Sequence, residues 1–277
     1  MILRTMFRSA ATPLSLLSLL VLTTAAPLPL AHGAGPTTYE EVLRLVEEAT
    51  ASVKSWSADI ETKMTMGGVE IKSRGETMGS GDRIMSDLAM EVMGQLMQVK
   101  SVLGADGIHW TETKAMGQIQ VFKLDMNVLG GSNGDSPSTP GRPGAGQGAA
   151  QDPSKMFENL GQMYDMTLTG NEVMDGTDTY LLEGTIKDEL KDRVDPSGNM
   201  ANMGMSPNKI RVAVGVDDGF VRKFEQINTA DVAFMSMTFT GIEINPSIDD
   251  SVFQYTAPQG ANVIDGTEMI TQGRGRH

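Results

Sequence analysis

Residues 56–66, which read WSADIETKMTM, contain the pattern that decides the fold. Apolar and polar residues alternate through this stretch, as expected for a β-strand with one buried face and one solvated face. Gly67 and Gly68 follow and are typical of a tight hairpin turn, after which Val69 and Ile71 begin the same alternation again. The stretch therefore predicts a pair of antiparallel strands.

The same alternation recurs along the rest of the chain, interrupted by turn signals such as Asp106-Gly107. It predicts about eleven strands that pair in sequential order as antiparallel hairpins. A sheet of this width tends to curl. Two amphipathic segments, Tyr39–Lys54 and Met156–Met163, predict helices that need an apolar surface to pack on. We therefore expect an α+β fold, in which a strongly curved antiparallel sheet forms an open half-barrel and the N-terminal and mid-chain helices cover its concave face.

The first 33 residues have the order of a secretory signal. Arg4 and Arg8 form a positive start, Leu14–Leu22 is mostly apolar, and Ala31-His32-Gly33 fits a cleavage site. The apolar run is short for a membrane span, although an uncleaved anchor is the alternative. The order predicts export and cleavage near Gly33.

Residues 34–277 are then expected to form a single domain with three irregular segments. Residues 130–151 are rich in Gly, Ser and Pro and lack any apolar period, so we expect a disordered loop there. Residues 188–207 predict a second loop that contains at most a helical turn, and residues 267–277 predict a flexible tail.

Composition argues against several function classes. A net charge of −13 repels phosphate backbones, so nucleic acid is not an expected partner. The absence of cysteine excludes disulfides, thiol catalysis and thiolate metal sites. His109 has no second histidine nearby in the sequence, and no nucleophile elbow, phosphate loop or zinc-protease motif is found. We therefore expect no enzyme, no catalytic residues, no metal and no cofactor.

Several stretches together resemble the LolA-like family of periplasmic lipoprotein carriers and outer-membrane lipoprotein-sorting proteins. Trp56–Ile60 after a helix is similar to the start of such domains, and Asp106–Trp110 resembles the Asp-Gly turn that precedes an aromatic residue. The closing pattern is the most specific part, and it comprises Phe220–Phe224, Ile248–Phe253 and Ala257–Asp265.

The resemblance covers most of residues 39–265 and implies a non-catalytic function and a location in the periplasm of the cell envelope. It implies a carrier, monomeric in our interpretation, that binds a lipid or the acyl chains of a lipoprotein in an apolar cavity and hands them to a membrane-anchored acceptor. A membrane-anchored donor is a further candidate partner. The alternative is a sensor of the same fold, which would bind a lipid or a misplaced lipoprotein and signal through another protein.

The residues expected to line the cavity are apolar residues of the predicted strands and of the second helix. Methionine is frequent among them, and its flexible thioether adapts to variable acyl shapes, although it also fills ordinary cores. The expected lipid-binding residues are Ile60, Met64, Leu88, Met90, Val92, Met97, Trp110, Phe122, Leu124, Met156, Leu160, Met235, Met237 and Phe239.

The resemblance gives less support to a locked lid. In the family, an arginine that precedes a proline holds the lid, whereas the nearest candidate here, Arg83, is followed by Ile84. Three methionines, Met200, Met203 and Met205, lie in the predicted second loop and could form the edge of a lid or simply be exposed.

Overall fold

The computed structural model describes residues 35–128, 153–194 and 199–267. All of the elements below belong to the compact unit that begins at Pro36. The predicted signal segment 1–33, the predicted loop 130–151 and all but the first residue of the predicted tail 267–277 lie outside the described residues.

The first half of the fold is a helix followed by an antiparallel meander. Helix α1 spans Tyr39–Thr50, and its start is the capping box, in which Thr38 Oγ1 accepts from the Glu41 amide at 3.2 Å while the Glu41 carboxylate accepts from the Thr38 amide at 3.2 Å. Six strands follow, namely β1 (Ser55–Met66), β2 (Val69–Ser80), β3 (Arg83–Val92), β4 (Gln95–Leu103), β5 (Ile108–Ala115) and β6 (Gln118–Asp125).

The second half repeats this plan and ends with an additional strand. Its elements are α2 (Pro153–Met163), β7 (Tyr164–Met174), β8 (Thr177–Ile186), α3 (Asp188–Val194), α4 (Asn199–Asn202), β9 (Pro207–Gly215), β10 (Val221–Asn228), β11 (Ala233–Ile244), the 3-10 helix η2 (Asp250–Phe253) and β12 (Asn262–Asp265). The two halves are joined where β1 pairs with β11, so that Ile60 lies opposite Phe239.

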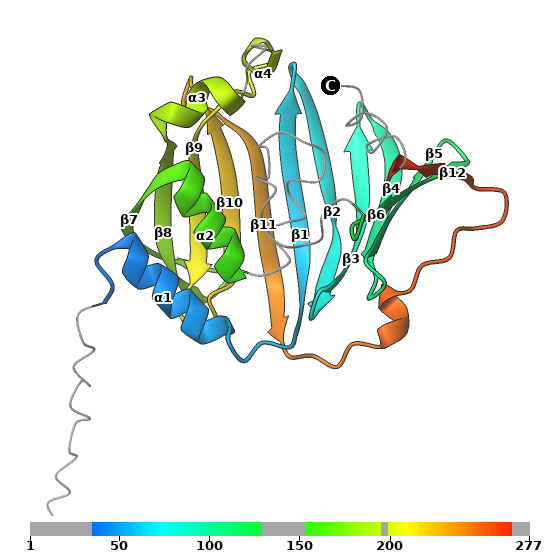
Figure 1. The fold of residues 1–277 in the computed structure, drawn as a ribbon. Coiled ribbons are helices and arrows are strands. Elements are labelled where there is room, and N and C mark those ends of the chain that lie inside the picture. The colour runs from blue at the N-terminus through cyan, green and yellow to red at the C-terminus, as the bar shows by residue number, and fades with distance from the viewer. Residues whose placement is uncertain (1–34, 129–152, 195–198, 268–277) are drawn as a thin grey trace, which may run out of the picture. The chain divides into compact units, whose positions relative to one another are not determined.

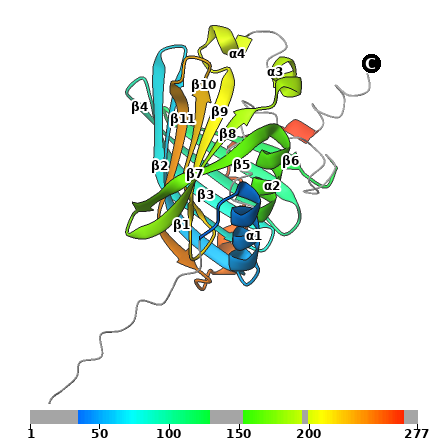
Figure 2. The same ribbon diagram turned by 90° about the vertical axis from the view of Figure 1, so that its left-hand side faces the viewer.

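All twelve strands form one sheet in the order β12-β6-β5-β4-β3-β2-β1-β11-β10-β9-β8-β7 (Figure 1). Every pairing is antiparallel except that of β12 with β6, which is parallel. The sheet is curved, and α1 and α2 pack together against one side of it (Figure 2). The expected open, mainly antiparallel sheet with covering helices is confirmed.

The helices cover only part of the face that they were expected to share. The strand side chains packed with α1 and α2 come from β1 and from β7 to β11, and none of those in this cluster comes from β2 to β6. Leu190 of α3 and Val216 after β9 also belong to the cluster. We call the helix side of the sheet the inner face. Its covered half is the part over β1 and β7–β11, and its open half is the part over β2–β6.

The structure refines the strand count and corrects one predicted loop. Within the described residues the sheet has twelve strands, where about eleven were expected. The additional strand is β12, a four-residue strand whose partner β6 lies more than a hundred residues earlier, and no local pattern indicates such a pairing. The predicted loop 188–207 contains α3 and α4, and its last residue begins β9. Acidic residues at the start of α3, Asp188 and Glu189, favour a helix there because they oppose the positive end of its dipole.

Candidate functional site

The inner face of β1 to β6 carries no acidic, lysine or arginine side chain. Cross-strand partners share a face, so the register extends the inner face from Ile60 to Gly75, Leu88, Val99 and Thr113 in turn. Along each of these strands, every second residue from those positions is apolar or neutral and polar. The acids and the basic residues of β1 to β6 lie at the intervening positions, on the outer face. A face this wide without charge is suited to an uncharged, water-insoluble ligand.

The predicted lipid-binding residues of the strands share this inner face, with one exception. Those of the covered half that pack with the helices are Ile60, Met235, Met237 and Phe239, and the predicted residue Leu160, on α2, lies in the same cluster. Those that α1 and α2 leave uncovered are half-buried, and they are Met64, Leu88, Met90, Val92, Met97, Phe122 and Leu124. The side chain of Met156 lies outside the described part of α2.

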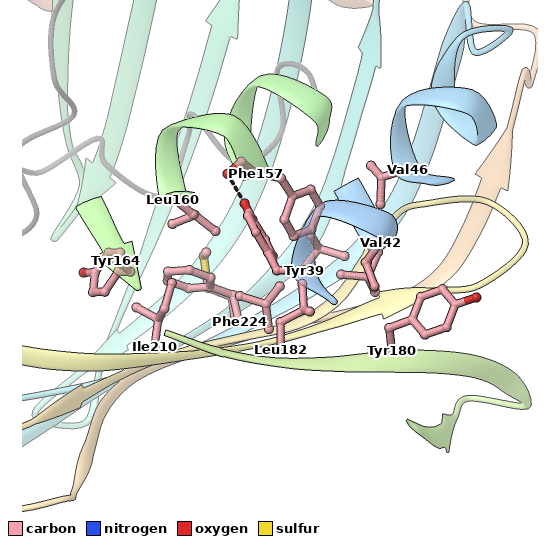
Figure 3. Close-up of a cluster of buried hydrophobic side chains, with 14 of the residues drawn as sticks. Tyr39, Val42, Val46, Phe157, Leu160, Tyr164, Tyr180, Leu182, Ile210 and Phe224 are labelled. Atoms are coloured by element: carbon pink, nitrogen blue, oxygen red, sulfur yellow. Dashed lines mark hydrogen bonds between the residues drawn. The ribbon is translucent and has the colours of Figure 1, made fainter. Parts of the chain in front are cut away.

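The covered half is a closed hydrophobic core. Met237 is 4% exposed and Leu160 is 6% exposed, and both lie in one cluster with Tyr39, Phe157 and Phe224. Figure 3 shows Tyr39, Phe157 and Leu160 of the helices pointing toward Phe224 of the sheet. These side chains fill the space between helices and sheet, so the residues predicted to line a cavity here instead hold α1 and α2 in place.

Two polar contacts fix α2 over this core. The Tyr39 hydroxyl donates to the Phe157 carbonyl, and Lys187 Nζ donates to the Gly161 carbonyl at 2.8 Å. Burial, together with the charge of Glu40, raises the pKa of Tyr39 to about 12, so its hydroxyl stays protonated and able to donate. α2 is therefore attached to α1 and to the end of β8, not only by apolar contact.

The open half has a row of hydroxyl groups that the sequence analysis missed. Thr77, Ser86, Ser101 and Thr111 lie directly opposite one another on β2, β3, β4 and β5. Thr77 and Ser86 hydrogen-bond at 2.8 Å, and Ser101 bonds His109 Nε2 at 2.7 Å. Each of these residues occupies a core-side position of an alternating strand, which is the signal that could have identified the row.

The chemistry of the open half is therefore divided along the strands. In the hydroxyl row, Thr77 and Ser101 are buried and already hydrogen-bonded, whereas Ser86 and Thr111 are half-buried and can bind a ligand. Burial lowers the pKa of His109, beside this row, below its ordinary value, so that the ring is neutral near pH 7. On β3 and β4, the rows that follow toward the β3–β4 turn are apolar, with Leu88 opposite Val99 and Met90 opposite Met97. This arrangement can accommodate an acyl chain along the apolar rows and an ester or hydroxyl group at the polar row.

Trp110 is the exception among the predicted strand residues, because it lies on the outer face. Its ring stacks on Tyr255 at a centroid distance of 5.4 Å, and the Tyr255 hydroxyl donates to Glu112 at 2.7 Å. β5 alternates without a clear apolar side, so its pattern could not indicate which face Trp110 occupies. Trp110 thus packs against the segment that leads from β11 to β12, away from the open half.

Arg83 also contacts this outer segment and not the helices. Its guanidinium binds Asp250 at 2.6 Å and lies 4.8 Å from the centre of the Phe253 ring. Phe253 packs on Met85 and Val102 in a second, smaller hydrophobic cluster. The structure thus corrects the weak expectation of a lid lock at Arg83, because this residue fastens η2 to the back of the sheet.

Within residues 35–128, 153–194 and 199–267, no group of three His, Asp or Glu side chains is placed to hold a metal ion. No helix in the same ranges is long and apolar enough to cross a membrane.

Comparison with known proteins finds likeness only at the level of the fold. No protein-family model and no curated protein matches the chain. Among solved structures, an uncharacterized conserved protein from Thermus thermophilus is similar at 10% identity and a TM-score of 0.46, covering 82% of this chain and 98% of that one. MucB in its complex with MucA, from Pseudomonas aeruginosa, is similar at 15% identity and a TM-score of 0.42, covering 79% and 61%.

A LolA superfamily protein from Nitrosomonas europaea is similar at 12% identity and a TM-score of 0.31, covering 79% of this chain and 99% of that one. Identities and TM-scores this low carry no function from those proteins to this chain. The resemblance to the LolA-like family, expected from Trp56–Ile60 and the closing pattern, is thus found again among solved structures as a likeness of fold.

Proposed function

We propose that this protein is an exported, non-catalytic carrier that binds the acyl chains of a lipid or lipoprotein on the open half of the inner face. The observation that carries the proposal is the uncharged inner face of β1–β6, where half-buried apolar side chains lie outside the cover of α1 and α2. Such a surface is costly to leave in water, and an acyl chain can cover it without introducing a charge.

The energetics favour an acyl chain over a small polar ligand. Each methylene moved from water onto an apolar surface contributes about 0.8 kcal/mol, so a chain of ordinary length gains enough to bind tightly. Two hydroxyls of the row, those of Ser86 and Thr111, are half-buried, and they add specificity for an amphiphile with a neutral ester or hydroxyl group, because such a group can hydrogen-bond to them.

The test is binding of a fluorescent fatty-acyl probe to protein purified without detergent. We expect the wild type to bind and Leu88→Asp to bind at least about tenfold more weakly, because a carboxylate would then lie where the chain packs. The matched control is Ala89→Asp, which places the same charge on the exposed outer face of the same strand, opposite Arg74. A wild type that binds no acyl probe, or a Leu88→Asp that binds as well as Ala89→Asp, would refute the proposal.

Carrier and sensor share this binding step and differ in the fate of the bound ligand. A carrier loaded with the probe should transfer it to acceptor membranes, whereas a sensor should retain it and change its affinity for a partner protein. Release of bound probe to vesicles on a timescale of minutes supports the carrier, and retention of the probe supports the sensor.

Export is part of the proposal and has its own test. Protein recovered from the envelope of its native host should begin near Ala34 by intact mass, since residues 1–33 have the order of a cleaved signal. A mature protein that retains Leu14–Leu22 would contradict cleavage.

A further inference from the structure

The turns at the two ends of the sheet differ in chemistry. Because the strands are antiparallel, the β2–β3, β4–β5, β7–β8 and β9–β10 turns share one end, and each of them contains an aspartate, namely Asp82, Asp106, Asp175, and Asp217 with Asp218. The β1–β2, β3–β4, β5–β6 and β10–β11 turns share the other end. The first three have the central residues Gly67-Gly68, Met93-Gly94 and Met116-Gly117, and the fourth contains Asp231, which is paired with Lys209 at 3.2 Å. We call these the acidic end and the apolar end.

The methionines at the apolar end occupy a position that disfavours them. Met93 and Met116 have φ angles of 51° and 50°, and each is followed by a glycine that also has a positive φ. The β7–β8 turn has the same geometry, with φ of 50°, but uses Asp175, which is one of the residues that this left-handed conformation prefers. Among the two-residue turns with this geometry, the one at the acidic end carries an aspartate and the two at the apolar end each carry a methionine, at a conformational cost. Asp231, in the longer β10–β11 turn, also has a positive φ, of 61°.

The side chains of Met93 and Met116 are not buried in the fold, so burial does not offset the conformational cost of their positive φ angles. Met93 is 80% exposed and Met116 is 79% exposed, and Leu96, next to the first of these turns, is 76% exposed. Strained backbone conformations cluster where a segment contacts a ligand or a partner. Met93 and Met116 thus project from the described part of the chain at a conformational cost that burial does not offset.

Further apolar side chains extend this end across the neighbouring strands. Met66 of β1 and Met203 after α4 are also exposed, and the two segments are joined by the hydrogen bond from the Gly67 amide to the Met203 carbonyl at 3.4 Å. The loop that holds Met203 is joined in turn to the β10–β11 turn, where Asn228 donates to the Gly204 carbonyl at 2.8 Å. Figure 1 shows α4 beyond the ends of β9 and β10, at the end toward which β1 runs.

The apolar end is continuous with the open half of the inner face. On β3, the inner-face residues Met90 and Val92 lead directly to Met93, and on β4 the inner-face residue Met97 follows Leu96. No charged residue occupies the central positions of the β1–β2, β3–β4 and β5–β6 turns, whereas the chain as a whole carries a net charge of −13. The tips of these three turns therefore suit a surface that has an apolar interior and an outer layer without net charge.

We propose that the apolar end docks on a zwitterionic phospholipid bilayer, with Met93, Met116 and Leu96 inserted at the level of the headgroups. Unbranched methionine side chains at the tips of hairpins can enter the interface without placing backbone carbonyls in the hydrocarbon. The aspartates of the acidic end then face the solvent. Docking in this orientation opens the inner face toward the membrane, so that an acyl chain could pass between the bilayer and this face without crossing water. This role of the docking rests on the proposed function.

The test is co-flotation of the full mature protein with phosphatidylcholine vesicles. The variant is Met93→Asn with Met116→Asn, because asparagine suits the positive φ of both turns and should leave the fold at least as stable. We expect the double variant to bind vesicles at least about tenfold more weakly than the wild type, because it lacks the two apolar side chains whose transfer from water into the bilayer favours binding. The matched control is Val173→Asn, which removes an exposed apolar residue next to the turn of β7–β8 at the acidic end and should bind as the wild type does.

Charge and salt give a second measurement. Binding to phosphatidylcholine should be insensitive to salt, and replacing part of it with an anionic phospholipid should weaken binding, because the protein is strongly negative. Wild-type protein that ignores phosphatidylcholine vesicles overturns the inference, and so does a double variant that floats as well as the wild type. If neither binds vesicles, but only the wild type binds a purified envelope protein, the apolar end is a protein interface and the membrane inference is also overturned. Binding of the soluble fatty-acyl probe by the double variant shows whether the open face works independently of this outcome.

Discussion

Replacing Met237 with aspartate tests the division of the inner face into a closed half and an open half. Met237 is 4% exposed and lies opposite Phe224 on β10 and Thr62 on β1, inside the cluster that holds the helices. If this half were a ligand cavity, water could solvate the new carboxylate and the variant would be only modestly less stable. In a closed core the carboxylate has no such solvent, and the outcome is different.

The expected cost follows from the burial of Met237. Truncating a buried methionine typically costs about 2–5 kcal/mol, and burying an unpaired carboxyl group adds several kcal/mol even if it takes up a proton. The sum reaches about 5 kcal/mol or more, which is comparable with the whole stability of many domains, about 5–15 kcal/mol. Leu88→Asp, on the half-buried open face, should cost only about 1 kcal/mol, because only part of that side chain is removed from water in the native protein.

The assay is urea unfolding followed by circular dichroism, run on both aspartate variants and on Met237→Leu. The leucine variant keeps the volume and polarity of the side chain, so it should lose less than about 1.5 kcal/mol and shows that the position tolerates substitution. We expect Met237→Asp to be largely unfolded or to lose most of its unfolding free energy, while Leu88→Asp keeps a cooperative transition close to that of the wild type. Equal stability of the two aspartate variants would refute the closed core and restore the cavity beneath α1 and α2.

Three further predictions concern other parts of the fold. Tyr39→Phe should lower the unfolding free energy by about 1–3 kcal/mol in urea titration, because the buried Phe157 carbonyl loses its donor; an unchanged value would mean that this bond does not hold α2. Burial lowers the pKa of His109, so its contribution to stability is present above the unfolded-state pKa of about 6.5 and is lost as the pH falls below it. His109→Gln should therefore show a smaller loss of unfolding free energy than the wild type between about pH 7.5 and about pH 5.5, and an identical loss would exclude His109 as its source. Deleting residues 131–149 should leave thermal unfolding cooperative, because that segment contains too few apolar residues to support a core and loop length has little entropic effect; loss of the transition would show that the segment stabilises the fold.

The sequence by itself determined the class of the fold and the content of its faces. The alternation that begins at Trp56 indicates which residues of a strand share a side, and this depends only on the two-residue period of the extended chain. The capping residues Thr38 and Glu41 likewise announce α1 through contacts within a few residues. Local chemistry of this kind predicted the curved sheet, both helices and nearly all of the apolar residues that share the inner face.

Only the tertiary structure decided which of those residues are sealed and which remain accessible. Met237 and Leu88 have similar patterns in the sequence, but β11 lies beneath the helices and β3 does not, because the pairing of β1 with β11 places the second half of the chain under α1 and α2. The two-residue period also does not predict which face of the sheet Trp110 occupies, because β5 has no clearly apolar side. The orientation of β5 follows from its neighbours in the sheet. The gathering of Met93 and Met116 at one end, opposite the aspartates, depends on strand order in the same way. Long-range strand pairing and helix packing set these features, and no window of local sequence contains the contacts that produce them.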